Sequence, residues 1–487
     1  MKPPSPPQAS GRISPHRVIL LVLLLHASRV FAQHAPASPD RPWDSTHEKE
    51  IQSEATILST YKFSLDSAKT YSLAEPIDLA EAHNPQTRLA WERARAQAAA
   101  LGIARSELYP TLAAVALSQI NRNEVLFGTT FLSQTVEASQ AALDLSYTVF
   151  DFGARAGRIA GAKAQVLAAG FGFNDTHRTV IDQVQQAYYR LLNAAGQEDA
   201  ARASLANAQT VQQAAEDRLK QGLATLPDVL EARSATAQAD YQLQAVLGAE
   251  EIARGDLATA LGSSPAATIQ VQPLNALSIP ESIGDTVEQA IQRGFEQRPD
   301  LLQQVAEIRS ANARAREARA AFYPTLSLGA NPNTQLLYGS QQALPWIHTA
   351  GFYGGLSASL NWTVFDGGAR SSRLAQAEAS VHATEAQATV IRDEVADQVW
   401  AAYSNMHTAF RQRQAATALL EAASQSYAAA LEAYKLGVRN LLDVTAAQQT
   451  LAQARSTDVL ARTQVLSAWA DLAFRTGESI QPGARVP

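Results

Sequence analysis

The sequence predicts a mainly α-helical fold in which long antiparallel helical hairpins carry a few amphipathic β-strands. One observation is a duplication: Tyr-Thr-Val-Phe-Asp-Phe-Gly-Ala-Arg at 147–155 returns as Trp-Thr-Val-Phe-Asp-Gly-Gly-Ala-Arg at 362–370, 215 residues later. A second is that no proline occurs from 154 to 221 or from 369 to 436, over 68 positions each. A continuous helix of that length would reach about 100 Å.

Other landmarks repeat at nearly the same step. The Tyr-Pro pairs end at Pro110 and Pro324, and Lys-Gln-Gly222 returns as Lys-Leu-Gly437. The period far exceeds the 20–50 residues of solenoid repeats, which indicates a domain-sized duplication. We therefore predict a first repeat at 73–262, a connector at 263–284, a second repeat at 285–477 and a short tail at 478–487.

The N-terminus has the features of a secretory signal, which we place at residues 1–32. Arg12 and Arg17 precede an apolar run at 18–25, and Val30-Phe-Ala32 supplies small residues for cleavage. A short membrane anchor is the alternative, but eight apolar residues fall well short of the roughly 20 needed to span a bilayer. Residues 33–72 begin polar and proline-rich, and we expect a poorly ordered lead-in.

Composition excludes several classes of protein. The formal net charge is −6, which disfavours a nucleic-acid partner. There is no cysteine, hence no disulfide, thiolate metal site or lipidated N-terminal cysteine. Histidines lie far apart, and no hydrolase, nucleotide-binding or zinc motif occurs, so we predict no catalytic, cofactor-binding or metal residues. After the signal, no apolar run reaches 18 residues.

Each repeat opens with a predicted helix, at 85–108 and 299–322, rich in Ala, Arg, Glu and Gln. Both helices stop at a Tyr-Pro pair, because proline cannot continue the helical hydrogen-bond ladder. Pro110 and Pro324 are therefore predicted helix-to-strand transitions.

Period-two alternation then predicts two strands in each repeat, at about 111–121 and 139–150, and at about 325–332 and 353–365. In the second strand, Leu143, Leu145 and Tyr147 alternate with Asp144 and Ser146. Loops are expected at 122–138 and 333–351. An ordinary soluble sheet is the alternative, but the surrounding sequence is helical and offers these strands no obvious cover.

The long helices are predicted to end at Gly222 and Gly437, with Lys220 and Lys435 in the last turn. A second helix then returns, at about 227–261 and 441–476. Each repeat is thus an antiparallel helical hairpin with two strands at one end.

The doubled strand pair, the Phe-Asp-x-Gly-x-Arg at the strand exit and the Lys-x-Gly turn followed by an aspartate resemble the TolC family of outer-membrane channel proteins, over about residues 75–477. The resemblance implies a homotrimer whose twelve strands close one β-barrel in outer-membrane lipid, continued by an α-barrel across the periplasm of a Gram-negative bacterium. It implies a passive exit duct of a tripartite efflux pump or type I secretion system. The partners would be a periplasmic adaptor and, through it, an inner-membrane transporter.

The family's functional positions carry over to three sets of residues. Strands would become helices at Pro110, Pro324, Asp151, Gly153, Asp366 and Gly368. The adaptor-contacting tip would comprise Gly222, Leu223, Gly437 and Val438, although both glycines are explained equally well as helix caps. The periplasmic gate would use Asp228, Tyr434 and Arg439 as links, with Asp443 in a constriction ring.

The two gate aspartates have an alternative reading, as carboxylates that interact with helix N-termini. The sequence also departs from the family pattern. Ala446 stands where a second ring carboxylate is expected, Pro227 where a hydroxyl residue is expected, and Phe152 where the second repeat has Gly367.

A periplasmic coiled-coil adaptor or scaffold without a pore is the alternative function. Such proteins have helical hairpins but lack duplicated amphipathic strands, and a secreted hydrolase would need a catalytic constellation that we do not find. The exit duct is therefore the leading hypothesis.

Overall fold

The computed structural model describes residues 48–58, 63–280, 284, 286–341 and 346–478. The chain divides into two compact units, Met1–Lys62 and Phe63–Pro487. Within the first unit the described residues form helix α2 (Glu48–Leu58). The predicted signal at 1–32, the start of the lead-in and nearly all of the C-terminal tail lie outside the described residues.

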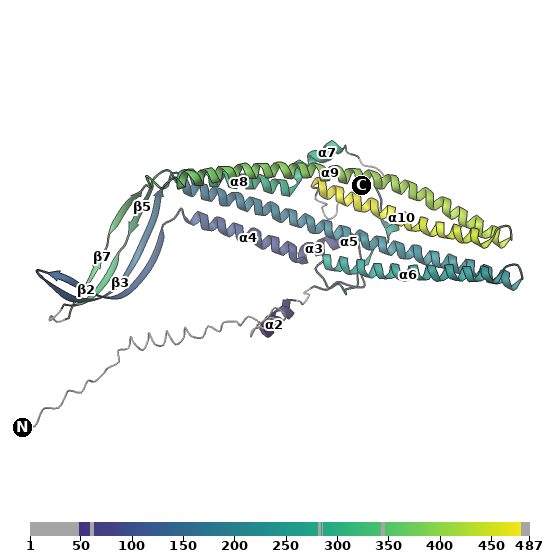
Figure 1. The fold of residues 1–487 in the computed structure, drawn as a ribbon, viewed down its shortest axis with the longest axis horizontal. Coiled ribbons are helices and arrows are strands. Elements are labelled where there is room, and N and C mark those ends of the chain that lie inside the picture. The colour runs from purple at the N-terminus through teal and green to yellow at the C-terminus, as the bar shows by residue number, and fades with distance from the viewer. Residues whose placement is uncertain (1–47, 59–62, 281–283, 285, 342–345, 479–487) are drawn as a thin grey trace, which may run out of the picture. The chain divides into compact units, whose positions relative to one another are not determined.

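The second unit contains both repeats (Figure 1). The first repeat consists of α3 (Ala74–His83), α4 (Pro85–Ser106), β2 (Thr111–Phe127), β3 (Thr130–Phe150), α5 (Ala154–Lys220) and α6 (Leu226–Ala260). The second consists of α7 (Val287–Gln297), α8 (Pro299–Ala320), β5 (Thr325–Ala330), β6 (Asn333–Gln341), β7 (Ile347–Tyr353), β8 (Leu356–Asn361), α9 (Ala369–Lys435) and α10 (Leu441–Thr476). The sheet lies at one end of this unit and the hairpin turns lie at the other.

The six predicted helices match their predicted ranges to within three residues at each end, whereas α2, α3 and α7 were not predicted. Helices α5 and α9 each run for 67 residues without a break. Their inward positions are mostly alanine and valine, and small side chains let neighbouring helices approach closely. Among the described helices none combines the length and the apolar character that crossing a membrane requires.

The strands of the first repeat are longer than predicted, and the loop expected at 122–138 is wrong. β2 and β3 pair without interruption from Thr111 opposite Ser146 to Phe127 opposite Thr130. A two-residue turn joins them, with Gly128 at a φ of +63° in its first central position, as a tight hairpin requires. The apolar alternation stops near residue 121, but backbone pairing continues through a polar stretch that the side-chain pattern had assigned to a loop.

The second repeat departs from the prediction at both ends of its strands. The expected loop at 333–351 contains β6 and β7, which pair with each other from Asn333 opposite Tyr353. The predicted strand at 353–365 ends early, at Asn361, opposite Thr325. Thr325 is the first residue of β5 and follows Pro324, so the chain beyond Asn361 meets no further partner there.

The described sheet is best understood as four long antiparallel strands. β3 pairs on one side with β2 and on the other with both β5 and β6. The break between β5 and β6 falls at Asn331-Pro332, and the break between β7 and β8 at Gly354-Gly355. Leu143 N–H still donates to Pro332 O at 3.0 Å, which keeps the third long strand aligned across its break.

The register separates an apolar face from a polar face. Residues directly opposite one another share a face. Leu112 faces Leu145, Tyr147 faces Leu328, and Leu360 faces Leu326. Thr111 faces Ser146, and Ser327 faces both Thr148 and Ser359, on the other side. No helix of the described chain covers either face, so Leu112 and Leu356 remain 66% and 90% exposed.

Two helix ends abut other helices near the middle of the unit. The Asn84 side chain accepts a hydrogen bond from the Gln86 N–H at 2.8 Å and donates one to Ala260 O at 2.9 Å, so it joins the start of α4 to the end of α6. Where α10 ends, the Arg178 guanidinium donates to Phe474 O. At each junction a glycine in the left-handed conformation follows the helix end. Gly262 follows α6 at φ +77°, and Gly477 follows α10 at φ +87°.

Part of the predicted lead-in is ordered. Thr70–Tyr71 (β1) pairs in parallel with Gln270–Val271 (β4) of the connector, which also contains a short 3-10 helix at Leu274–Ala276. Tyr71 is buried, and its carbonyl accepts a hydrogen bond from the Tyr188 hydroxyl at 3.3 Å. The expectation of disorder is therefore wrong for residues 48–58, which form α2, and for residues 70–72, because Tyr71 anchors that segment to α5.

Candidate functional site

The duplicated Asp-x-Gly-x-Arg motif lies between the last strand of each repeat and the long helix that follows it. Asp151 Oδ2 accepts the Arg155 N–H at 2.8 Å and Arg155 Nε at 3.1 Å, and Oδ1 accepts the Gly153 N–H at 3.3 Å. Asp366 makes the corresponding bonds to Arg370 and Gly368, at 2.9–3.2 Å. One carboxylate thus satisfies free N–H groups at the start of the helix and fixes the arginine beside it.

The two copies differ at one strained position. Phe152 has a φ of +49°, a left-handed conformation that its counterpart Gly367 adopts at +65°. The Phe152 ring stacks on Tyr323, with centroids 5.0 Å apart, and meets Phe150 edge-on at 4.6 Å. These aromatic contacts offset the backbone cost, which is about 1–2 kcal/mol for a residue with a β-carbon.

Pro110 and Pro324 lie directly before β2 and β5, after the last turns of α4 and α8. Together with the Asp-x-Gly turns, they place all six predicted transition residues at the junction of strands and helices.

At the opposite end, both hairpin turns are Schellman caps. Gly222 N–H donates to Leu219 O at 2.9 Å, and Leu223 N–H to Arg218 O at 2.8 Å. Gly437 and Val438 repeat this pattern on Tyr434 and Ala433, both at 2.9 Å. The glycines are therefore helix caps. The caps also leave apolar side chains in solvent: Leu223 is 62% and Val438 78% exposed.

One residue that we did not predict joins the two tips. Arg218 Nη1 donates to Tyr434 O at 2.6 Å and to Lys435 O at 3.3 Å, and Nη2 donates to Leu223 O at 3.3 Å. The guanidinium also lies 4.8 Å from the centre of the Tyr434 ring. A cation near the end of α9 is also favoured by the helix dipole. The equivalent position in the second repeat is Ala433, so a search for doubled motifs passes over Arg218.

Tyr434 is buried beneath this arginine, and its hydroxyl has no hydrogen-bond partner among the described residues. Burial raises the pKa of the phenol, against the opposing effect of the Arg218 charge. Within one chain, Tyr434 therefore interacts with Arg218. It makes no hydrogen bond to Asp228, although the negative charge of Asp228 adds to the rise in the phenol pKa.

Asp228 caps its own helix in the described chain. Its Oδ2 accepts the Thr225 N–H at 2.8 Å and the Thr225 hydroxyl at 2.7 Å. These hydrogen bonds, assisted by the Arg218 charge, hold the pKa of the carboxyl below its ordinary value of 3.8. Thr225 thus supplies a hydroxyl at the turn even though Pro227 stands where one was expected.

The lowered pKa gives this cap a defined dependence on pH. The stabilisation is fully present above the unfolded value of 3.8 and is lost as pH falls through the lower folded value. We expect the amides of Thr225, Leu226, Asp228 and Val229 to be better protected from hydrogen exchange at pH 5 in the wild type than in Asp228→Asn, with the difference lost as pH falls through the lowered pKa of Asp228. Equal protection at pH 5 would contradict the cap.

Arg439, just before α10, and Asp443, in its first turn, form an exposed pair with Nη1 and Oδ2 3.6 Å apart. The Asp443 N–H is capped by Asn440 Oδ1 at 2.9 Å. Such a pair contributes only about 0.3–0.5 kcal/mol, so it does not fasten the tip within one chain. The structure therefore brings together Arg218 and Tyr434, and separately Arg439 and Asp443.

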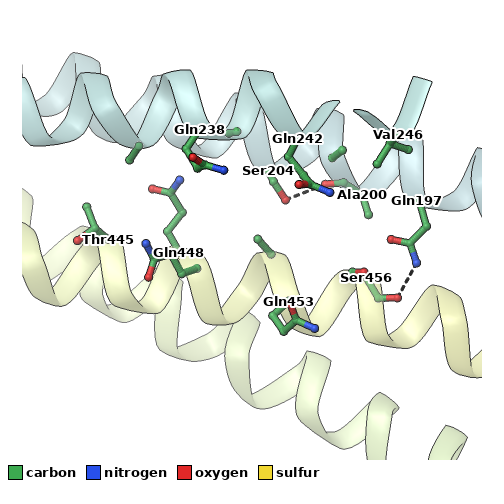
Figure 2. A pocket seen from close by; sticks show the side chains of 15 residues that line it. Gln197, Ala200, Ser204, Gln238, Gln242, Val246, Thr445, Gln448, Gln453 and Ser456 are labelled. Carbon is green, nitrogen blue, oxygen red and sulfur yellow. Dashed lines mark hydrogen bonds between the residues drawn. The ribbon is translucent and has the colours of Figure 1, made fainter. Parts of the chain in front are cut away.

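Between the tip and the middle of the unit, a groove of about 360 Å³ lies among α5, α6 and α10. Figure 2 shows the Gln197 amide from α5 reaching α10, where Nε2 donates to Ser456 O at 2.8 Å. The side chains that line this groove are uncharged and mostly Ala and Gln. Gln448 Oε1 is buried there without a hydrogen-bond partner among the described residues. The hairpins are thus joined loosely along this groove and firmly at Arg218.

Comparison with known proteins agrees with this architecture. The family model described as "Outer membrane efflux protein" matches residues 77–263 and again 290–478, once in each repeat. Protein CyaE of Bordetella pertussis is 29% identical over 422 residues, 85% of both chains. The outer membrane protein OprJ of Pseudomonas aeruginosa is 27% identical over 448 residues, 89% of both chains.

Solved structures show the same fold. A membrane protein from Pseudomonas aeruginosa superposes with a TM-score of 0.73 at 24% identity, over 92% of this chain and 99% of its own. The outer-membrane channel OprN superposes with a TM-score of 0.72 at 20% identity, over the same shares. Two family matches that together cover most of the chain show that this protein belongs to the outer membrane efflux protein family, whose members are transport channels of the Gram-negative outer membrane.

Proposed function

We propose that three copies of this chain form one exit duct, in which twelve long strands close a β-barrel and the helical hairpins continue it as an α-barrel. The observation that carries this proposal is the described sheet: four long strands with both faces uncovered and two outer strands, β2 and β7/β8, that each lack a partner on one side. An open edge cannot face lipid, because its backbone groups would be left without hydrogen bonds. Closure by further copies removes both edges.

The apolar face would meet lipid, and the polar face would line the water-filled lumen. From Leu112 to Ile120, β2 is apolar except at Ser118 and Gln119, and this length is close to that with which a tilted strand spans a bilayer. Beyond it, Arg122 faces Thr135 and Glu124 faces Ser133, so the hairpin would continue outside the lipid. This change in polarity supports insertion of the sheet only as far as residue 120.

The helix tips would contact a periplasmic adaptor and, through it, an inner-membrane transporter that supplies the energy. The cargo would be a drug, a metal ion or a secreted polypeptide, and its passage through this chain would be passive. Exposed apolar side chains at the two caps support the contact: Leu223, Leu226, Leu436, Val438 and Leu442. Gly222 and Gly437 would turn the chain sharply and so place these apolar side chains toward the adaptor.

The closed tip would be held by contacts within and between chains. Arg218 and Tyr434 would act within a chain, and Arg439 with Asp228 between neighbouring chains. Three copies of Asp443 would place a ring of carboxylates at the constriction and favour cations. A single ring of Asp443 carboxylates, without a second ring at position 446 because Ala446 stands there, would select cations less strongly than two rings.

The assembly is tested by electron microscopy and mass determination on protein extracted in mild detergent. We expect a three-chain tube, much longer than it is wide. A monomer that dissolves without detergent would overturn the duct and favour a scaffold without a pore.

Arg439→Ser tests the proposed link between chains. We expect a higher single-channel conductance in planar bilayers than for the wild type, because the neighbouring tip loses its cationic partner. Since the pair with Asp443 is weak within one chain, thermal stability should change little. No rise in conductance would remove Arg439 from the gate.

A further inference from the structure

We propose that a cavity between the start of α5 and the end of α8 binds an anionic phospholipid headgroup, with its acyl chain along the apolar face of the sheet. The cavity has a volume of about 340 Å³ and is lined by Phe152, Gly153, Ala156, Gly157, Ala160, Arg316, Arg319, Ala320 and Tyr323. The inference rests on the proposed function in one respect, namely that this sheet lies in a membrane.

The cavity is continuous with the apolar face of the sheet. Phe150 pairs with Leu326, which faces Leu360 on the apolar side. The Phe150 ring touches Phe152, and Phe152 stacks on Tyr323 at the cavity wall. An acyl chain that lies against the sheet would therefore contact these rings. It would reach the cavity at the level where the apolar face ends. Aromatic side chains are favoured at this level of a membrane protein.

The floor of the cavity is lined by small residues of α5 and α8. At Gly157 a β-carbon would lie 3.0 Å from the Glu317 backbone nitrogen and 3.1 Å from Ala313 O. Glycine thus lets α5 and α8 approach closely beneath the two arginines. Ala156, Ala160 and Ala320 leave the remaining space unfilled.

The cationic wall of the cavity is only partly neutralised. Arg316 is exposed and makes no hydrogen bond or ion pair within the described chain. Arg319 Nη2 forms an exposed pair with Glu378 Oε1 at 3.0 Å, which a phosphate can displace at little cost.

The nearby carboxylates are outnumbered by arginines. Arg158 pairs with Glu107 at 2.6 Å and with Glu317 at 3.2 Å, so its single positive charge offsets one of these two carboxylates. More widely, segments 100–110, 151–161, 314–324 and 366–376 hold eight arginines and four acidic residues, in a chain whose net charge is −6. A basic ring at the end of an apolar surface matches the phosphates of a lipid leaflet.

The test is native mass spectrometry of the detergent-solubilised protein with added phosphatidylglycerol or the zwitterionic phosphatidylcholine. We expect the wild type to retain phosphatidylglycerol preferentially, and Arg316→Gln/Arg319→Gln to lose about tenfold in that preference, since each arginine near a phosphate contributes measurably. Arg314→Gln is the matched control, because Arg314 is exposed on the same helix but does not line the cavity.

Three results would overturn the proposal: an unchanged preference in the double variant, an equal loss in Arg314→Gln, or displacement of the lipid by millimolar inorganic phosphate, which would indicate a site for free anions. Because binding is measured in micelles, it can be read whether or not the protein conducts. Planar-bilayer conductance of the same samples tests the duct separately.

Discussion

Gly477→Ala is expected to destabilise the protein by about 3–5 kcal/mol, combining a left-handed backbone with an overfilled contact. The glycine ends α10 at φ +87°. A β-carbon there would lie 2.9 Å from Gln297 Cβ, 3.0 Å from Gln297 C and 3.1 Å from Arg298 N. These atoms belong to the link between α7 and α8, whose backbone cannot move aside cheaply.

Gly222→Ala is the matched control for this prediction. Gly222 has a similar φ of +74°, but no atom lies within 4 Å of the position that a β-carbon would take. The Gly222→Ala variant should therefore lose only the stability that a left-handed backbone costs a residue with a β-carbon, about 1–2 kcal/mol. The measurement is the apparent melting temperature in detergent, followed by circular dichroism of the helices. If both variants melt at the same temperature, the close contact at the junction contributes nothing.

Arg218→Met is expected to raise the open probability and the mean conductance of the channel. The substitution removes three charged hydrogen bonds from one hairpin tip to the backbone of both tips, together with the contact to Tyr434. Methionine keeps much of the apolar stem. A loss of about 2 kcal/mol from these bonds would change the ratio of closed to open tips about thirtyfold.

Arg233→Met is the control for that experiment. Arg233 lies near the same tip, but its guanidinium pairs with Glu216 Oε1, at 2.9 Å, within the first hairpin alone. Its loss should leave conductance near the wild-type value. An equal rise in both variants would mean that general loosening near the tip, rather than the link between hairpins, controls opening.

The helical part of the fold was predictable because its signals are local. Proline-free stretches, Tyr-Pro stops and Lys-x-Gly caps each act on the residues that carry them, and α5 and α9 end within two residues of the predicted glycines. The strand ends were not predictable in this way. Residues 122–138 pair through their backbones while their side chains follow no apolar alternation, and β8 stops at Asn361 because β5 has no residue left to pair with it.

The candidate site was predictable where it is duplicated and missed where it is not. Asp151 and Asp366 stand out because the motif occurs twice, and both turn a strand into a helix. Arg218 has no counterpart in the second repeat, and its partners are mainly backbone carbonyls, which no side-chain pattern reveals. The part of the gate that links different chains stays a prediction from the family resemblance.

The asymmetry of Arg218 has a mechanical consequence for the proposed trimer. Six hairpins would surround the axis, but the arginine occurs once in each chain and joins that chain's own two hairpins. The first movement would therefore occur between chains, with the two hairpins of each chain coupled, and full opening would follow only when Arg218 releases its own chain's second hairpin. An adaptor that inserts between two chains would displace both hairpins of one chain at once.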